Sequence, residues 1–276
     1  MRIYKTLPDL RKERHLAIWH KALRARWTPE DIDWSPAPAL SRAARDHLAR
    51  VLSPVLMGEQ AGLYSITTMI QILGRTSDVE SQFFLTTMAV DEAKHTELFA
   101  RYYRRLDRTP LSIRRFPSGY LFQAHVMSRD PLEWLTGSLV SECLAKHTLE
   151  ELHRLDLDPV LNALSDRILE DEARHLGFNH VFLEDRLGAM ASDGNGAAAD
   201  LPDHLRRRLR AVLDYVPPIL EGLDADIRAL GVDRAGFYHR LHADVEKRLE
   251  RSILCGKKMA ADGSGAPDSP APDASP

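Results

Sequence analysis

Apolar residues recur every three to four positions along most of this chain, and the strict alternation of a half-buried strand is almost missing. This periodicity predicts an all-α protein. The expected helices run over Leu7–Trp27, Ser41–Leu73, Ser77–Leu106, Tyr120–Ser128, Pro131–Leu155, Asp158–Gly188, Leu201–Leu230 and Asp233–Cys255. Within the second range, Ser53-Pro54 indicates that one helix ends and a second begins, because proline is accommodated in the first turn of a helix.

Two segments of small and turn-forming residues interrupt the helical pattern. Ala189–Asp200 predicts a linker. Gly256–Pro276 predicts a disordered tail, because so few apolar residues cannot bury enough surface. We therefore expect one folded domain over residues 1–255, with its main bundle at about 41–188 and C-terminal helices over 201–255, followed by a disordered tail over 256–276.

Each of the four long helices expected within 41–188 carries a glutamate on its apolar stripe, and two of them carry a histidine three positions later. Residues three apart share a helix face, so each such pair points the same way. Burying an ionised carboxylate without a partner costs several kcal/mol, and two divalent cations would compensate the four carboxylates. The six candidate metal ligands are Glu59, Glu92, His95, Glu142, Glu172 and His175.

The two Glu-x-x-His pairs lie in near-identical segments, Asp91-Glu-Ala-Lys-His95 and Asp171-Glu-Ala-Arg-His175. A glutamate from each of two helices and a Glu-x-x-His from each of two others is the donor set of a dinuclear site in a four-helix bundle. Consecutive ligand glutamates lie 33, 50 and 30 positions apart, and the longest interval leaves room for an additional short helix. A third Glu-x-x-His, Glu150 with His153, lacks the preceding aspartate and is interpreted as surface.

The aspartates that open the two segments are predicted to support the histidines. A histidine that binds a metal usually donates its other ring N–H to a carboxylate, which fixes the tautomer. In a bundle with approximate twofold symmetry, Asp171 would serve His95 and Asp91 would serve His175.

Lys146, four positions after Glu142, is the candidate catalytic residue outside the metal ligands. It would bind a substrate carboxylate, supply a proton or pair with a glutamate; alternatively, its stem would cover the core while the ammonium reaches water. Small residues near two of the glutamates also have two interpretations, a cavity for oxygen and a small substrate or close helix packing. These residues are Gly58, Ala61, Gly62, Gly137 and Ser138.

Residues 27–179 resemble the non-haem di-iron carboxylate proteins of the ferritin-like superfamily. The segment Trp27-Thr-Pro-Glu-Asp-Ile-Asp33 is similar to the one that precedes the first ligand helix in the ribonucleotide reductase small subunit. The Asp91–His95 segment is similar to the related ligand-binding oxidases. The resemblance implies a ferritin-like four-helix bundle with additional N- and C-terminal helices. It also implies an electron path from Trp27 through Asp171 to His95.

Each of these relatives has a diagnostic residue that this chain replaces. Phe99 stands where a radical-bearing small subunit has tyrosine, and the tail contains no tyrosine to pass a radical onward. Gly62 and Gly137 stand where the ligand-binding oxidases have a valine and a tyrosine that cross-link. Ile168 stands where the para-aminobenzoate N-oxygenases add a third histidine. The chain therefore fits the superfamily better than any single member of it.

The resemblance implies two iron ions, or a manganese/iron pair in the alternative, with O2 as co-substrate. The predicted function is that of an O2-activating oxidase or monooxygenase, which performs N-oxygenation, hydroxylation or desaturation of a small organic substrate. Repeated turnover requires an external electron donor. Two alternatives stay open, a radical or electron-transfer subunit of a larger enzyme and ferritin-type iron storage. Phe99 disfavours the first, and the chain length disfavours the second.

The composition and charge of the chain indicate its class, its partners and its location in the cell. Hydrophobic residues make up 44% and charged residues 28% of the chain, which is typical of a globular protein. A net charge of −3 argues against a nucleic-acid partner, and no apolar run approaches the ~20 residues that cross a membrane. The chain has two cysteines and no signal-peptide pattern, which favours a reduced, cytoplasmic protein. We expect a homodimer.

Overall fold

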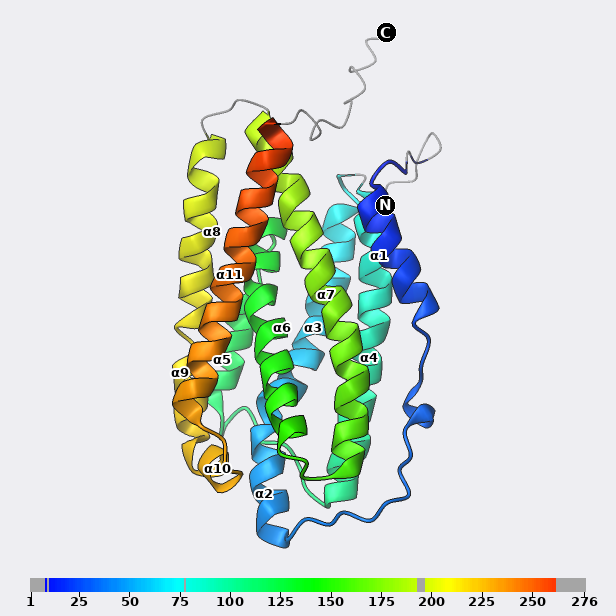
Figure 1. Ribbon diagram of the computed structural model, residues 1–276, viewed down its shortest axis with the longest axis vertical. Helices are drawn as coiled ribbons and strands as arrows, with labels where there is room; N and C mark the ends of the chain where they lie inside the picture. Colours follow the sequence, from blue (N-terminus) through cyan, green and yellow to red (C-terminus); the bar gives the residue numbers. More distant parts are fainter. Residues whose placement is uncertain (1–7, 9, 77, 193–196, 262–276) are drawn as a thin grey trace.

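The computed structural model describes residues 8, 10–76, 78–192 and 197–261 (Figure 1). The described residues form helices joined by short connections, with no strand among them. In chain order the elements are α1 Glu13–Arg24, the short 3-10 helix η1 Pro29–Asp31, α2 Arg42–Val51, α3 Ser53–Leu73, α4 Val79–Leu106, α5 Pro117–Val126, α6 Pro131–Arg154, α7 Pro159–Ser192, α8 Ala197–Leu213, α9 Val216–Gly222, α10 Asp224–Ala229 and α11 Arg234–Ala261.

Helices α3, α4, α6 and α7 form a four-helix bundle, in which α3 packs on α4 and α6, and α7 packs on the same two helices. Aromatic side chains such as Phe84, Phe99, Tyr102 and Phe182 fill its core and are almost fully buried. α1 packs on the outside of α4 and α7, and α8 and α11 lie on the other flank (Figure 1). The predicted all-α four-helix bundle with additional N- and C-terminal helices is confirmed.

Capping residues set where the bundle helices begin. Ser53 and Pro54 start α3 directly after α2, as the sequence predicts. Asp78 accepts a hydrogen bond from the backbone N–H of Ser81 at the start of α4, and Asp130 accepts two backbone N–H bonds at the start of α6. Each cap satisfies N–H groups that a helix terminus would otherwise leave unpaired.

The helices after α7 differ from the prediction. The expected helix Leu201–Leu230 is three helices, α8, α9 and α10. Pro217 and Pro218 lack the N–H that would continue α8, and they are accommodated in the first turn of α9. The expected linker Ala189–Asp200 is partly helical, because α7 continues to Ser192 and α8 begins at Ala197; residues 193–196 lie outside the described residues.

α11 also continues past the predicted end at Cys255, as far as Ala261. It packs there on the end of α7, and Gly256 allows the close approach. A Cβ at Gly256 would lie 2.7 Å from the Cβ of Leu187 and 3.1 Å from the carbonyl oxygen of Glu184. Packing on α7 therefore stabilises residues that composition alone assigns to the tail. The rest of the predicted disordered tail, from residue 262, lies outside the described residues.

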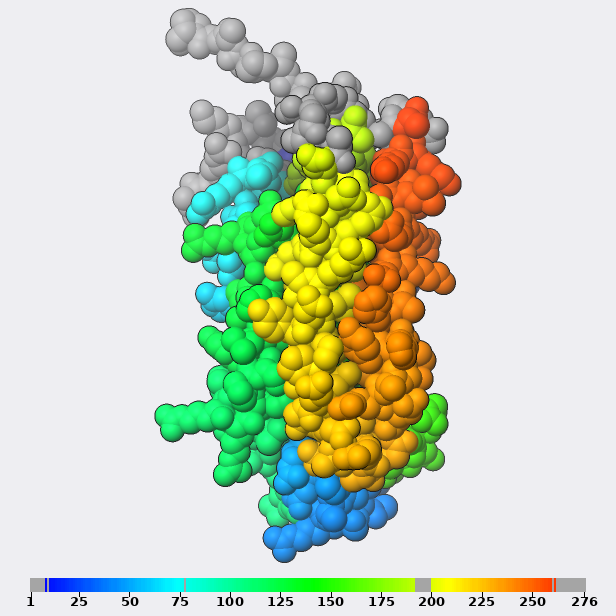
Figure 2. Space-filling view, turned by 90° about the vertical axis from the view of Figure 1, so that its left-hand side faces the viewer, coloured from blue at the N-terminus to red at the C-terminus, as the bar shows by residue number. Residues whose placement is uncertain are grey.

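The C-terminal helices hold α5 against the bundle. In Figure 2, α8 and α11 (yellow and orange) cover the flank beside α5 (green). The guanidinium of Arg208 on α8 donates to the carbonyl oxygens of Val126 and Met127 at 3.2 and 3.5 Å. These carbonyls end α5, so Arg208 fixes the end of that helix beside α3 and α6. No helix in the described ranges combines the length and the apolar character that a membrane crossing requires.

Candidate metal centre

The six side chains predicted as metal ligands converge inside the bundle. One or two come from each of the four helices, and all of them except Glu142 are at most 3% exposed. They form two groups, in each of which the donor atoms of three residues lie within 4.8 Å of one another. The first group is Glu59, His95 and Glu172; the second group is Glu92, Glu142 and His175.

Each group combines one imidazole with carboxylates from other helices. In the first group, His95 Nδ1 lies 3.0 Å from Glu59 Oε2 and 3.7 Å from Glu172 Oε1. The centroids of the His95 and His175 rings are 6.1 Å apart, so the two groups are neighbours.

The second group has the same composition. His175 Nδ1 lies 3.4 Å from Glu142 Oε2 and 3.7 Å from Glu92 Oε1. The glutamate of each Glu-x-x-His therefore also reaches the histidine of the other motif, which gives the pair of groups an approximate twofold arrangement.

Each carboxylate in this centre makes it harder for its neighbours to ionise, because their negative charges repel. Burial and the neighbouring Glu59 and Glu142 raise the pKa of Glu92 well above its ordinary value. Burial and Glu142 likewise raise the pKa of Glu172. Burial also opposes the charge of Glu142, but the adjacent Glu172 and His175 side chains bring its pKa down to about 2.

Two atoms of the centre, Glu172 Oε2 and His175 Nδ1, are buried without a hydrogen-bond partner in the part of the chain that the structure describes. Buried polar atoms are normally satisfied, so these two require another partner. Four carboxylates and two imidazole nitrogens in two adjacent groups have the charge and the donor chemistry that suit a pair of divalent cations.

The aspartates of the two motifs contact the outer nitrogens of the histidines, in the pairing that the sequence predicts. His95 Nε2 lies 3.2 Å from Asp171 Oδ2, and His175 Nε2 lies 3.3 Å from Asp91 Oδ2. Although burial opposes its charge, Glu59 and Asp171 raise the pKa of His95 to about 10. Asp171 also accepts a hydrogen bond from Trp27 Nε1 at 3.1 Å. A continuous chain of contacts therefore joins Trp27, Asp171 and His95.

Two cations that sequence reasoning missed contact the aspartates. Lys94 Nζ lies 2.8 Å from Asp91 Oδ1 and 3.2 Å from Asp171 Oδ2, and it sits 4.0 Å from the centre of the Trp27 ring. Arg174 contacts both aspartates as well. Lys94 and Arg174 each precede the histidine of their motif, and this repeated basic residue is the signal that could have identified them.

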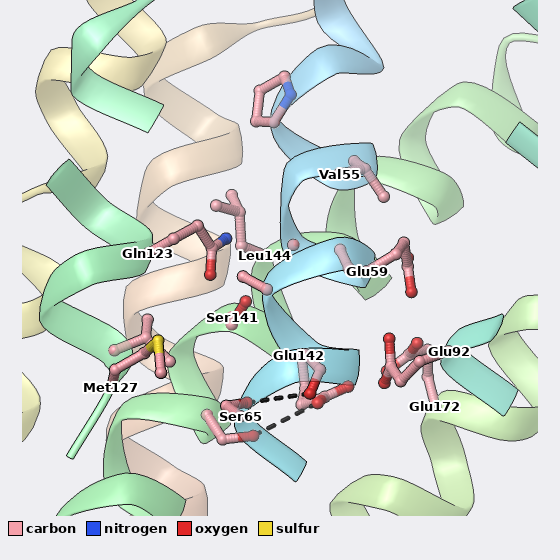
Figure 3. A pocket seen from close by; sticks show the side chains of 17 residues that line it. Val55, Glu59, Ser65, Glu92, Gln123, Met127, Ser141, Glu142, Leu144 and Glu172 are labelled. Atoms are coloured by element: carbon pink, nitrogen blue, oxygen red, sulfur yellow. Dashed lines mark hydrogen bonds between the residues drawn. The ribbon is translucent and has the colours of Figure 1, made fainter. Parts of the chain in front are cut away.

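A cavity of about 30 Å³ adjoins the carboxylates and lies between α3, α5 and α6. Figure 3 shows Glu59, Glu92, Glu142 and Glu172 on one side of it. The remaining lining is uncharged and includes Ser65, Gln123, Val55, Met127, Ser141 and Leu144.

The predicted small residues divide between the two interpretations. Gly58, Ala61, Gly62 and Ser138 border the cavity. A Cβ at Gly62 would lie 3.0 Å from the Glu92 carboxylate, so glycine leaves room for that side chain. Gly137 serves packing instead, because a Cβ there would lie 2.6 Å from the Val126 carbonyl oxygen at the end of α5.

Of the roles predicted for Lys146, the contacts of its ammonium favour the one in which the stem covers the core and the ammonium reaches water. Its Nζ lies 3.0 Å from Glu150 and 3.8 Å from Asp244 of α11, in a separate groove between α6, α7 and α11. Four residues advance a helix by about 40° beyond a full turn, and the long stem carries the ammonium to these surface carboxylates. His153 of the third Glu-x-x-His pairs with Asp166 at 3.1 Å on the surface, as predicted.

Residues 66–213 of the chain, more than half of its length, match the family described as p-aminobenzoate N-oxygenase AurF. The matched range contains five of the six candidate ligands; Glu59 lies just before it. It also contains both Asp-Glu-Ala-x-His motifs.

Structures of an R2-like ligand-binding oxidase have the same fold. One, with an aerobically reconstituted metal cofactor after photoconversion, gives a TM-score of 0.69 at 19% identity and covers 91% of this chain and 99% of that chain. Another, with an aerobically reconstituted Mn/Fe cofactor, gives 0.67 at 19% identity over 91% and 98%. A mutant with an anaerobically reconstituted Mn/Fe cofactor gives 0.73 at 17% identity over 91% and 98%. Together with the family match, this likeness confirms the predicted superfamily.

Proposed function

The chain belongs to the p-aminobenzoate N-oxygenase AurF family, and on that premise we propose that it N-oxygenates a small, uncharged amine at a dinuclear metal centre. The broader predictions, an oxidoreductase and a small organic substrate, are confirmed by the family match. The dinuclear metal cofactor is supported by the two groups of donor atoms. N-oxygenation is therefore favoured over hydroxylation and desaturation. A radical-storing subunit and ferritin-type storage are disfavoured for the same reason.

The observation that carries the proposal is the convergence of two three-donor groups inside the bundle. One metal ion would bind Glu59, His95 and Glu172, and the other would bind Glu92, Glu142 and His175. Carboxylate and imidazole donors suit both iron and manganese, so either two iron ions or a manganese/iron pair fits. When bound, the metal pair supplies the activation of O2.

The aspartates orient the two ligand histidines. Asp171 and Asp91 each accept the Nε2–H of a histidine, so that, when a metal ion is bound, the ring would be neutral and would present its Nδ1 lone pair to that ion. Burial opposes the charge of Asp171, but His95, Lys94 and Arg174 hold its pKa below the ordinary value. The aspartates therefore stay ionised and keep the rings in place.

The cavity beside the metal ligands indicates the charge of the substrate. Its described lining contains four glutamates but no lysine, arginine or histidine. A substrate carboxylate would be buried there without a counter-charge, which costs several kcal/mol. An uncharged amine can instead form hydrogen bonds with Ser65, Gln123 or Ser141. We therefore propose a substrate without an acidic group.

The cavity must enlarge to admit such a substrate. Its volume of about 30 Å³ holds little more than one water molecule, whereas an engineered cavity of ~150 Å³ admits benzene. Gln123 and Met127 border it at the end of α5 (Figure 3). Both side chains have several rotatable bonds, so we propose that their movement opens the cavity.

Electrons from an external donor would enter through Trp27. Its indole nitrogen is 3.1 Å from Asp171, and Asp171 is 3.2 Å from His95. The Trp27 and His95 rings are also stacked, with an angle of 12° between their planes. These contacts form a continuous route from Trp27 to the first ligand group, and the resemblance to the ribonucleotide reductase small subunit supports it.

We also propose that two copies of the chain associate through α3 and α4, as a cytoplasmic homodimer. α3 contains one charged residue, Glu59, and that residue is buried. Tyr64 on α3 is 65% exposed and Val90 on α4 is 59% exposed. An uncharged helix face with exposed apolar side chains is typical of a contact between subunits.

The function is tested with iron-loaded protein, ¹⁸O2 and a chemical reductant. We expect mass spectrometry to find ¹⁸O on the nitrogen of aniline and 4-aminobenzamide. We expect kcat/KM for 4-aminobenzamide to exceed that for p-aminobenzoate by about 10-fold or more, since each 1.36 kcal/mol of lost transition-state binding is tenfold. The variant Glu172→Ala is the metal-dependence control and should lack activity.

Two results would contradict different parts of the proposal. Failure to oxygenate the nitrogen of any of these amines would reject the N-oxygenase function. Preference for p-aminobenzoate over the uncharged amide would reject the substrate charge class while retaining the reaction.

A further inference from the structure

A second set of metal-binding side chains lies between α7 and α11, apart from the dinuclear centre. His180 and Glu184 stand one turn apart on α7, and Cys255 faces them from α11. One donor atom of each lies within 4.8 Å of the others, the same closeness as in the two groups of the dinuclear centre. Glu184 is 3% exposed, whereas His180 and Cys255 are partly exposed, so an ion can reach the set from solvent.

The hydrogen bonds around His180 leave its Nε2 facing a carboxylate. Ser252 Oγ lies 2.6 Å from Nδ1 of His180 and 3.2 Å from the carbonyl oxygen of Arg248. Nε2 of His180 lies 2.5 Å from Glu184 Oε1. When Ser252 accepts the Nδ1 proton, the neutral ring directs its Nε2 lone pair towards this carboxylate, which is the arrangement of two ligands of one cation.

The imidazole of His180, the carboxylate of Glu184 and the thiol of Cys255 therefore converge from two helices on one point.

We propose that His180, Glu184 and Cys255 bind one Zn²⁺ ion. Zn²⁺ takes imidazole, carboxylate and thiolate ligands, usually four in a tetrahedron. Three ligands come from the protein, and water takes the fourth position on the exposed side. On binding, the Cys255 thiol releases one proton, while His180 binds as the neutral imidazole and Glu184 as the carboxylate. The ion joins the ends of α7 and α11.

The neighbouring charges leave one carboxylate oxygen free for the ion. Arg14 pairs with Oε2 of Glu184, so Oε1 is the oxygen directed at His180. The thiolate also distinguishes this site from the dinuclear centre, whose donor set contains no sulfur and suits harder metal ions.

Cobalt(II) reports on this site, because it takes the ligands of Zn²⁺ and absorbs strongly in the near ultraviolet only when a thiolate is bound. The iron-loaded, full-length protein is titrated with Co²⁺ and then with Zn²⁺. We expect a thiolate-to-cobalt band that saturates at one ion per chain, with release of one proton, and that disappears when Zn²⁺ is added. Cys255→Ser should abolish the band. Cys143→Ser, which changes the chain's other cysteine in the core, should retain it.

Two results would overturn the proposal. The first is the absence of a thiolate band in the unmodified protein, and the second is a band of equal strength in Cys255→Ser. Cobalt at the dinuclear centre cannot imitate the signal, since that centre has no sulfur donor. The inference does not rest on the proposed function, because loss of N-oxygenation would leave the cobalt band in place.

Discussion

Two clusters of ionisable side chains in this bundle contain buried carboxylates, and the two clusters neutralise that negative charge differently. The end cluster, Lys12, His15, Asp78 and Arg186, lies where α1 meets α4 and α7. Asp78 lies 2.6 Å from Lys12 and 3.1 Å from Arg186, and although burial opposes it, Lys12 holds the pKa of Asp78 below its ordinary value.

In the metal centre the carboxylates face one another instead, and the pKa values of Glu92 and Glu172 are raised. A buried carboxylate needs a cation in either place. The end cluster takes its cations from side chains of the protein, whereas the metal centre leaves that role to metal ions. Lys94 and Arg174, the basic side chains beside the centre, pair with its two aspartates.

The largest expected effect comes from removing a ligand in the metal centre. His175→Ala should reduce the bound metal from two ions to one per chain and lower kcat/KM for N-oxygenation on the order of 10³-fold, because a metal contributes several kcal/mol to the transition state. Metal analysis and steady-state rates measure this. His153→Ala, in the surface Glu-x-x-His, is the control and should retain both ions. Two ions in His175→Ala would exclude this histidine as a ligand.

The end cluster should respond to acid through His15. Burial and Lys12 lower the pKa of His15 from 6.5 to about 3. Between these values the unfolded chain binds a proton that the folded chain does not, so stability falls as the pH drops. The free energy of unfolding should decline by up to about 1.4 kcal/mol per pH unit in this window.

Urea unfolding of the His15→Leu variant tests this pH dependence. The variant should show a flatter decline between pH 6.5 and pH 3. His20→Leu makes the same change at an exposed histidine of α1 and should keep the original decline. Equal slopes in the two variants would show that His15 is not the group responsible.

Neutralising one carboxylate in each region should change stability in opposite directions. Asp78→Asn should lower the free energy of unfolding by about 2 kcal/mol, because Lys12 and Arg186 lose their partner; both cations still reach water, which limits the loss. Glu92→Gln should raise the Tm of the metal-free protein, because it replaces a carboxylate whose charge burial disfavours. Calorimetry measures both changes in stability. If both variants shifted stability in the same direction, the two clusters would not differ in how their carboxylates are neutralised.

The smallest effect is expected at Trp27. Trp27→Phe keeps a ring beside His95 but removes the N–H that Asp171 accepts, at a cost of about 1 kcal/mol in stability. Reduction of the oxidised metal centre by a soluble donor should slow several-fold, as stopped-flow absorbance would show. Trp34→Phe removes a comparable hydrogen bond, to the Pro29 carbonyl oxygen at 2.9 Å. In this control variant the metal centre should be reduced at the normal rate. Equal rates in the two variants would remove Trp27 from the electron route.

The helical period is sufficient to predict the six donors that converge, because they are polar residues at positions of an apolar stripe. Glu59 and Glu142 are recognisable for that reason without any motif around them. Lys94 and Arg174 escaped the same reasoning, since a basic residue beside a buried stripe is ordinarily a surface residue. Their role depends on aspartates from a helix about 80 positions away in the sequence. Lys146 shows the opposite case. Its spacing places it near the donors, but its long side chain points to carboxylates of its own and the neighbouring helix.

By itself the sequence determined the helices of the bundle and the six donors, since periodicity acts within one helix and needs no knowledge of its neighbours. Only the tertiary structure decided the cations that balance Asp91 and Asp171 and the extension of α11. It also decided which cysteine meets His180 and Glu184. These features arise where two helices pack, and packing brings together residues whose distance along the chain carries no information about their distance in space.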